Sequence, residues 1–213
     1  MIAEILTILW ERRGFFAACL LEHIRISCTA VVIAGVLGIL IGVMITKYRK
    51  AAGLLLGIIN VFYTIPAISL LGFLIPFTGI GNKTAIIALT VYGLLPIVRN
   101  TYTGLTAVDE SIVEVARGLG SDERQLLCRI RFPLALPVII SGFRNMVVMI
   151  IAMGGIASFI GAGGLGVAIY RGITTYNMSL TAAGSLLIAL TALTADWILG
   201  KLEKKVRRRY EVE

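Results

Sequence analysis

The sequence predicts an all-α membrane protein, a polytopic bundle of about five transmembrane helices with one long polar loop. Of its 213 residues, 58% are hydrophobic and only 15% are charged, and the mean hydropathy is +0.92. Soluble domains are about 45–50% apolar and about 25% charged, so lipid is the natural solvent for most of this chain. The charged residues also fall between apolar runs of about 20 residues, the length that spans a bilayer.

The first 22 residues are expected to form an external segment at the membrane interface. Residues 2–21 form a short amphipathic stretch. Arg12-Arg13 resembles a twin-arginine export signal, but the apolar stretch after it is only about seven residues long before Glu22 interrupts it, at the lower limit for a signal sequence. An interfacial segment is therefore favoured over a processed signal.

The membrane domain is expected to cover residues 23–200. The predicted spans are the uncharged or nearly uncharged runs 26–46, 51–80, 84–98, 134–160 and 180–199. The second run is long enough to tilt or to bend at Pro66 and Pro76, whereas the third is short enough for a buried or re-entrant helix that Pro96 kinks near its end. Residues 201–213 then form a basic tail.

The distribution of cations predicts the orientation of the five spans. A cytoplasmic C-terminus places most of them on the inside, namely Lys47, Arg49, Lys50, the arginines between Arg99 and Arg131, and the cations of the tail. The outside then holds only Arg12, Arg13, Arg25, Lys83 and Arg171. By the positive-inside rule, the N-terminus is expected outside and the loop of residues 99–136 in the cytoplasm.

This loop contains the only long polar stretch inside the chain, and its pattern predicts two short helices. Residues 108–117 favour a helix with acids near its start, which Gly118 and Gly120 end. Ser121 is expected to cap a second helix with one apolar face, formed by Leu126, Leu127 and Ile130, which Pro133 and Pro137 end. Such a pair suits a docking surface for a partner protein, and a solvated connector is the alternative.

At these residues the sequence resembles a family. Glu114-Val115-Ala116, followed by Gly120 and by Ile130-Arg131-Phe132-Pro133, is similar in spacing to the EAA motif of membrane subunits of ATP-binding-cassette importers. Valine replaces the middle alanine and Phe132 a leucine, and both replacements are apolar. The segments 64–67, 94–105 and 157–166 are similar to permeases for glycine betaine, carnitine and choline.

The resemblance implies a type I importer permease for a quaternary ammonium compatible solute, in the bacterial cytoplasmic membrane. Glu114, Ala116 and Gly120 are then expected to shape a coupling helix that a separate ATPase receives, with Ile130 and Pro133 holding its return to the membrane. The implied partners are ATPase subunits, an extracytoplasmic substrate-binding protein and a second permease, identical or paralogous. ATP and Mg²⁺ would bind the ATPase, with no cofactor or metal in this chain. Another small polar substrate is the alternative.

The glycine-rich segment with Gly161, Gly163, Gly164 and Gly166 contains the spacing G-x-G-x-x-G. A dinucleotide site requires a strand before this motif, a helix after it and an acid about 20 residues on, whereas here the segment lies outside the membrane between two spans. We favour an external turn near the gate and the dock for the binding protein, either flexible or closely packed.

Two ionisable residues fall inside predicted spans, Arg144 and Asp196, and we expect them to pair or to reach toward the cytoplasmic interface. A structural role is favoured over contact with substrate. Tyr63, Tyr92 and Phe159 are candidates for the substrate path, because aromatic faces attract quaternary ammonium groups, although interfacial belts and core packing use the same residues.

Other classes of function fit the sequence less well. A secondary transporter or channel would show inverted repeats and broken helices in matching halves. A membrane enzyme would need clustered His, Asp or Ser near one interface, but the chain has a single histidine, His23. A nucleic-acid protein would gather its cations on one face with aromatic neighbours. The chain is therefore expected to transport rather than to catalyse.

Overall fold

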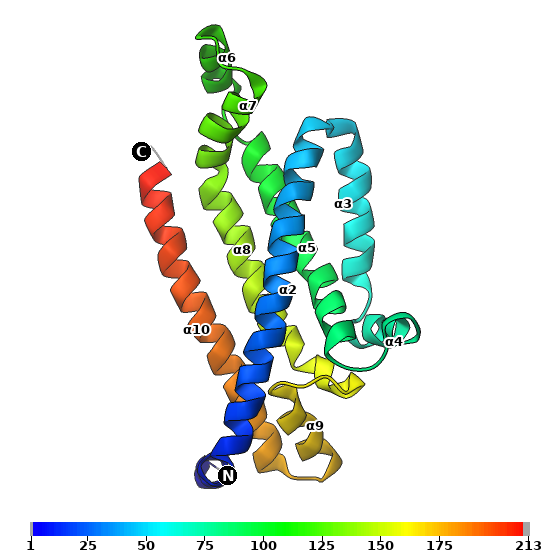
Figure 1. Ribbon diagram of the computed structural model, residues 1–213. Coiled ribbons are helices and arrows are strands. Elements are labelled where there is room, and N and C mark those ends of the chain that lie inside the picture. Colours follow the sequence, from blue (N-terminus) through cyan, green and yellow to red (C-terminus); the bar gives the residue numbers. More distant parts are fainter. Residues whose placement is uncertain (1, 211–213) are drawn as a thin grey trace.

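A computed structural model describes residues 2–210, and every regular element in that range is helical (Figure 1). This confirms the all-α prediction. The elements are α1 (Ile2–Glu11), α2 (Arg13–Lys47), α3 (Arg49–Thr64), α4 (Ala67–Thr78), α5 (Asn82–Thr106), α6 (Glu110–Gly118), α7 (Glu123–Gln125), the π-helical η1 (Leu126–Arg131), α8 (Phe132–Gly154), the 3-10 helix η2 (Ile156–Ile160), α9 (Gly166–Thr174) and α10 (Met178–Tyr210).

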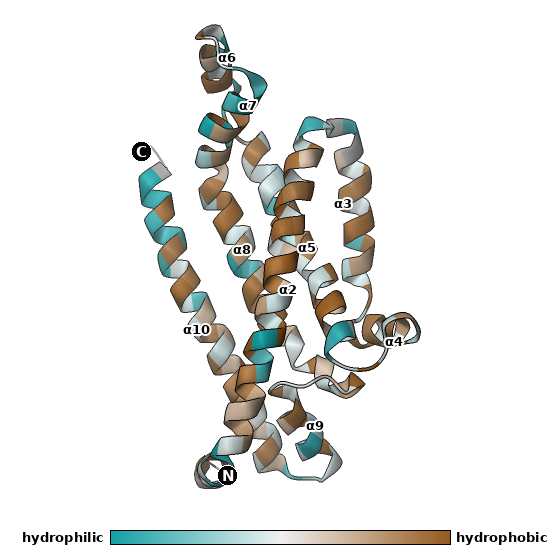
Figure 2. Ribbon diagram, viewed as in Figure 1, coloured by the Kyte–Doolittle hydropathy of each residue, from teal (hydrophilic) through white to brown (hydrophobic). Residues whose placement is uncertain are grey.

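Four helices in the described range are long and apolar enough to cross a membrane, and the bent pair α3 and α4 makes a fifth span if the two helices are counted as one broken span. The four are α2, α5, the continuous helix 123–154 and α10. The N- and C-terminal ends of the chain lie at opposite ends of the bundle, and α6 and α7 project at the C-terminal end (Figure 1). Brown, apolar residues follow the spans, and teal, polar residues gather mostly at the ends of the spans (Figure 2). Counted in this way, the bundle has the five spans that the sequence predicted.

The three central helices α2, α5 and α8 meet in one apolar core. Helix α2 contributes a row of small residues at every fourth position, Ala30, Ala34, Gly38 and Gly42, all of them buried. A Cβ atom on Gly38 would lie 2.1 Å from Cγ2 of Ile97 in α5. Small residues let two membrane helices approach closely enough to pack backbone against side chain. This row fixes α2 against α5, and the hydropathy pattern did not reveal it.

Three helix boundaries differ from the sequence expectation. Helix α2 begins at Arg13, so the second half of the expected interfacial segment belongs to the first long helix. Helix α5 continues through Arg99 to Thr106, and the re-entrant alternative for this segment is wrong. Helix α10 continues into the basic tail as far as Tyr210. In each case backbone hydrogen bonds continue past a charged residue, because a charged side chain at the end of a span can reach water without ending the helix.

The bend between α3 and α4 confirms the sequence expectation at Pro66. The helix axes turn by 99° there, and Ile65 has an extended backbone, as is common before proline. The hydroxyl of Tyr92 in α5 donates a hydrogen bond to the carbonyl of Ile65, which the bend leaves without a helical partner. Pro76, in contrast, lies inside α4 without breaking it.

The segment after α7 is not a separate helix ended by prolines. From Glu123 the chain runs as one helix to Gly154, through the π-helical turn η1 and past Pro133 and Pro137. The amide of Phe132 bonds to the carbonyl of Leu127, five residues back. This shift in hydrogen bonding accommodates a proline that has no amide proton to donate. The polar loop therefore joins the fourth span without a break.

Candidate functional site

Helix α6 lies at the tip of the polar loop and packs its inner face onto η1. Val113 and Ala116 are buried against Leu126, with Ile130 at the edge of the same small cluster. The spacing of three residues between Val113 and Ala116 places them on one face of the helix. Leu126, Leu127 and Ile130 were expected to form an apolar face suited to docking a partner, but Leu126 is only 2% exposed and packs against α6 of the same loop.

The outer face of α6 carries the exposed apolar side chains instead. Ile112, Val115 and Leu119 are 46%, 65% and 83% exposed. They are spaced by three and four residues and so share one side of the helix. Helix α6 thus has one wide apolar side: η1 covers the half with Val113 and Ala116, and the adjacent half, called here the outer face, is exposed. A helical projection of residues 110–119 would have revealed this width in the sequence. Glu114 is also exposed and lies on the polar side of the helix.

Both ends of α6 are capped. At its start the carboxylate of Asp109 accepts a hydrogen bond of 2.9 Å from the amide of Ser111, and this bond lowers the pKa of Asp109. At its end Gly120 has a φ angle of +90°, and the amide of Ser121 bonds to the carbonyl of Ala116. This is the Schellman arrangement, which requires a left-handed residue and favours glycine. Gly120 therefore ends the helix, as the sequence indicated.

The turn after Gly120 is fixed by a second cap. The expected cap of the following helix was Ser121, but Asp122 has that role in the structure. The carboxylate of Asp122 accepts a hydrogen bond from the amide of Gln125, and the side-chain oxygen of Gln125 accepts one from the amide of Asp122. This reciprocal pair is a capping box. The loop is therefore well ordered on both sides of Gly120.

Two ion pairs connect the parts of the loop. Arg117 of α6 bonds to Glu123 of α7 at 2.9 Å, and Arg131 of η1 bonds to Glu110 at the start of α6 at 3.1 Å. Exposed ion pairs contribute little stability each, so the buried cluster and the caps carry most of the order. The two ion pairs nevertheless connect both ends of α6 to the helix that continues into the fourth span. Pro133 lies at the start of α8, directly after this junction.

At the opposite end of the bundle, the glycine-rich segment forms a closely packed turn between η2 and α9. Gly161 and Gly164 have φ angles of +72° and +95°, which favour glycine. A Cβ on Gly166 would lie 2.0 Å from a backbone oxygen, and one on Gly163 would lie 1.9 Å from the carboxylate of Glu22. No strand precedes the motif in the described residues, so a dinucleotide site is contradicted.

Side chains from two other helices hold this turn. The amide of Gly163 donates to Oδ1 of Asn82 at the start of α5, and Nδ2 of Asn82 donates to Glu22 of α2, both at 2.9 Å. The Nε2–H of the buried His23 donates to the carbonyl of Ile151 in α8 at 3.0 Å. Sequence reasoning assigned no role to Glu22, His23 or Asn82, because their partners lie far away along the chain.

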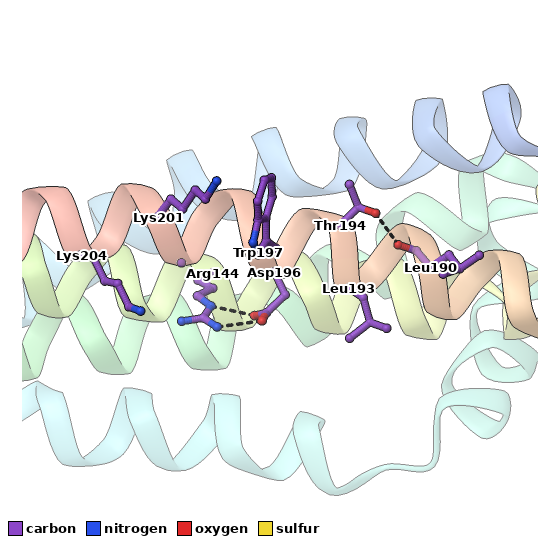
Figure 3. Close-up of a pocket in the computed structure, with 9 residues that line it drawn as sticks. Arg144, Leu190, Leu193, Thr194, Asp196, Trp197, Lys201 and Lys204 are labelled. Carbon is purple, nitrogen blue, oxygen red and sulfur yellow. Dashed lines mark hydrogen bonds and ion pairs between the residues drawn. The ribbon is translucent and has the colours of Figure 1, made fainter.

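The charged residues within the spans form one cluster. Arg144 of α8 donates two hydrogen bonds to the carboxylate of Asp196 in α10, at 2.6 and 2.7 Å (Figure 3). It donates a third, of 2.9 Å, to Glu203. The pairing of Arg144 with Asp196 is confirmed, and Glu203 is an additional partner. Gly200 makes room, since a Cβ there would lie 3.2 Å from the guanidinium carbon. The cluster therefore joins α8 to α10.

The candidate aromatic residues do not gather into one cage. Tyr63 and Tyr92 form an edge-to-face pair with ring centroids 6.2 Å apart, beside the bend between α3 and α4. Phe159 forms a separate pair with Tyr170, at 5.2 Å. Tyr92 is buried, whereas Tyr63, Phe159 and Tyr170 are partly exposed.

Comparison with known proteins agrees with this architecture. Residues 34–208 match the family described as binding-protein-dependent transport system inner membrane component. The chain is 38% identical over 185 residues to a carnitine transport permease protein, OpuCB, of Listeria monocytogenes, covering 87% of this chain and 85% of that protein. It is 48% identical over 161 residues to the ergothioneine transport permease/ergothioneine binding protein EgtU of Helicobacter pylori, covering 76% of this chain but only 29% of that longer protein.

Among solved structures, the inward-facing MetNI methionine ABC transporter has a chain that superimposes with a TM-score of 0.81. The match covers 92% of this chain and 98% of that chain at 23% identity, and it concerns the fold alone. Fold, motif and family match agree that this is a multi-pass membrane protein of the importer type. The chain belongs to the family of binding-protein-dependent transport system inner membrane components.

Proposed function

We propose that this chain is the permease subunit of an ATP-driven importer and that an ATPase subunit binds the outer face of α6. The observation that carries this proposal is the exposed apolar face formed by Ile112, Val115 and Leu119 on a helix that is capped at both ends. Large apolar side chains gathered on a polar loop favour a protein partner that covers them. ATP and Mg²⁺ would bind that partner, and α6 of this chain would transmit the partner's movement to the spans.

The connection between α6 and the membrane supports this role. The inner face of α6 rests on Leu126, and Arg131 is paired with Glu110. Because η1 continues without a break into α8, a push on α6 would move the fourth span as a rigid body. Five residues would then shape, seat and connect the coupling helix, namely Glu114, Ala116, Gly120, Ile130 and Pro133.

The bias of cations supports an orientation with α6 and the C-terminus in the cytoplasm and the N-terminus outside. The turn with Gly161, Gly163, Gly164 and Gly166 would then face the extracytoplasmic substrate-binding protein and lie near the gate. A second permease chain, identical or paralogous, would complete the pathway. Arg144 and Asp196 would brace α8 against α10 rather than touch substrate.

The substrate we propose is a trimethylammonium compatible solute such as glycine betaine, carnitine or choline. The named substrates of the two relatives, carnitine and ergothioneine, both carry a trimethylammonium group and a carboxylate. Ergothioneine itself is a second candidate, favoured by the 48% identity to its permease. Tyr63, Tyr92 and Phe159 would contribute aromatic faces to the path of this cation.

The docking proposal can be tested by co-purification of the ATPase with tagged permease from membranes. Leu119→Asp changes an exposed position on the outer face, and Glu114→Lys reverses the exposed charge of the motif on the polar side of the same helix, so the permease should fold while the ATPase is lost. Arg124→Asp, which places an acid in the first turn of α7 rather than on α6, is the matched control and should retain the ATPase. Equal recovery with all three variants would contradict the proposed docking face.

The substrate class can be tested by uptake in cells that express the whole system. Labelled glycine betaine, carnitine, choline and ergothioneine should be accumulated, or should compete with one another. Glycine, which lacks the three methyl groups of glycine betaine, is the matched control and should not compete. Competition by glycine as strong as that by glycine betaine would show that the quaternary ammonium is not recognised.

A further inference from the structure

A groove along α10 changes from apolar to cationic toward the C-terminal end of that helix. Its first part has a volume of about 760 Å³ and is lined by Leu190, Leu193 and Trp197, and then by Lys201 and Lys204. A second hollow of about 440 Å³ shares the two lysines and continues the groove. That hollow is also lined by Lys205, Arg208 and Arg209.

The length of the apolar part matches one leaflet of a bilayer. Leu190 and Lys201 are eleven residues apart, or about 16 Å along the helix, and half of a hydrocarbon core measures about 15 Å. Trp197 is 62% exposed, and the Lys201 ammonium lies 3.3 Å from the centroid of its ring (Figure 3). Tryptophan and lysine at this depth are typical of the boundary between acyl chains and headgroups.

Two acids accompany the groove, Asp196 in its lining and Glu203 one turn of α10 away from Gly200, and one guanidinium from α8 offsets part of their negative charge. Asp196 and Glu203 are both held by the guanidinium of Arg144, so their negative charge does not face the groove unopposed. The groove therefore presents the lysine ammonium groups as its dominant charge. An anion that approached along α10 would meet Lys201 and Lys204, both of which are exposed.

We propose that this groove binds an anionic phospholipid. The phosphate lies between Lys201 and Lys204, and an acyl chain lies along Leu190 and Leu193 beside Trp197. The change from apolar to cationic along α10 follows the same direction as the change from chain to headgroup in such a lipid. This site is independent of how the transporter is driven and of its substrate.

The two tryptophans allow a direct test, because Trp10 lies in α1 near the N-terminal end of the bundle and Trp197 lies in the groove. The full chain with Trp10→Phe is reconstituted into vesicles that contain either dibrominated phosphatidylglycerol or dibrominated phosphatidylcholine at equal mole fraction. Bromine quenches a tryptophan that it touches. Trp197 fluorescence, normalised to the same unbrominated lipids, should be quenched more strongly by the anionic lipid, with a preference of severalfold.

Substitution of the lysines gives the decisive comparison. In Lys201→Gln and Lys204→Gln the preference should fall by up to about fivefold for each lysine, and in the double variant it should be close to one. Lys83→Gln, the same change at the start of α5, should leave it unchanged. Three results would overturn the proposal. The protein with both lysines intact could show no preference for the anionic lipid, the double variant could keep that preference, or neither lipid could quench Trp197 because protein covers the groove.

Discussion

Gly120 offers the sharpest test of how the coupling loop is built. Gly118 and Gly120 both have open space where a Cβ would stand, but only Gly120 has a positive φ angle, of +90°. An alanine in the left-handed region costs about 1–2 kcal/mol. Gly120→Ala should therefore weaken the bend that follows α6, whereas Gly118→Ala, inside the helix, should be neutral or stabilise by up to about 1 kcal/mol.

The expected effect on docking follows from this energy. If the ATPase binds only the capped form of α6, a strain of about 1–2 kcal/mol weakens its binding by about 5- to 30-fold. The measurement is a titration of detergent-solubilised permease with the purified ATPase, alongside a thermal melt to show that the bundle is intact. If Gly120→Ala bound the ATPase as tightly as Gly118→Ala does, the cap would not position the docking face, and the reasoning would be refuted.

Three further predictions concern the bundle. Gly42→Val should sharply reduce the amount of folded protein in membranes, because a Cβ there meets α5 at 2.5 Å, whereas Gly57→Val, which faces open space, should not; equal yields would show that the small-residue row is dispensable. Arg144→Gln should lower the melting temperature in detergent, because it leaves the carboxylates that the guanidinium now binds without their partner, and adding Asp196→Asn should restore part of the loss; no recovery would argue against the pair. Gly166→Ala should impair folding more than either, because a Cβ would lie 2.0 Å from a backbone carbonyl oxygen that cannot rotate away, and a normal melt would exclude this packing.

The amino-acid sequence by itself determined the features that depend on local composition. Long apolar runs predicted the spans and the charged stretch between them predicted the polar loop, because the length and polarity of a segment decide whether it enters lipid. The proline at position 66 predicted the bend. Glycine at position 120 predicted the end of α6, since that conformation is a property of a single residue.

Tertiary structure decided the features that depend on pairs of residues far apart in the chain. Leu126 was expected on an apolar face suited to docking but is covered by α6, and the exposed apolar side chains lie on the outer face of α6 instead. His23 lies beneath the glycine turn and bonds to Ile151, 128 residues away, and Glu203 joins Arg144 across two helices. Periodicity shows that a helix has an apolar face, but the part of that face that is covered depends on the neighbour against which the helix packs.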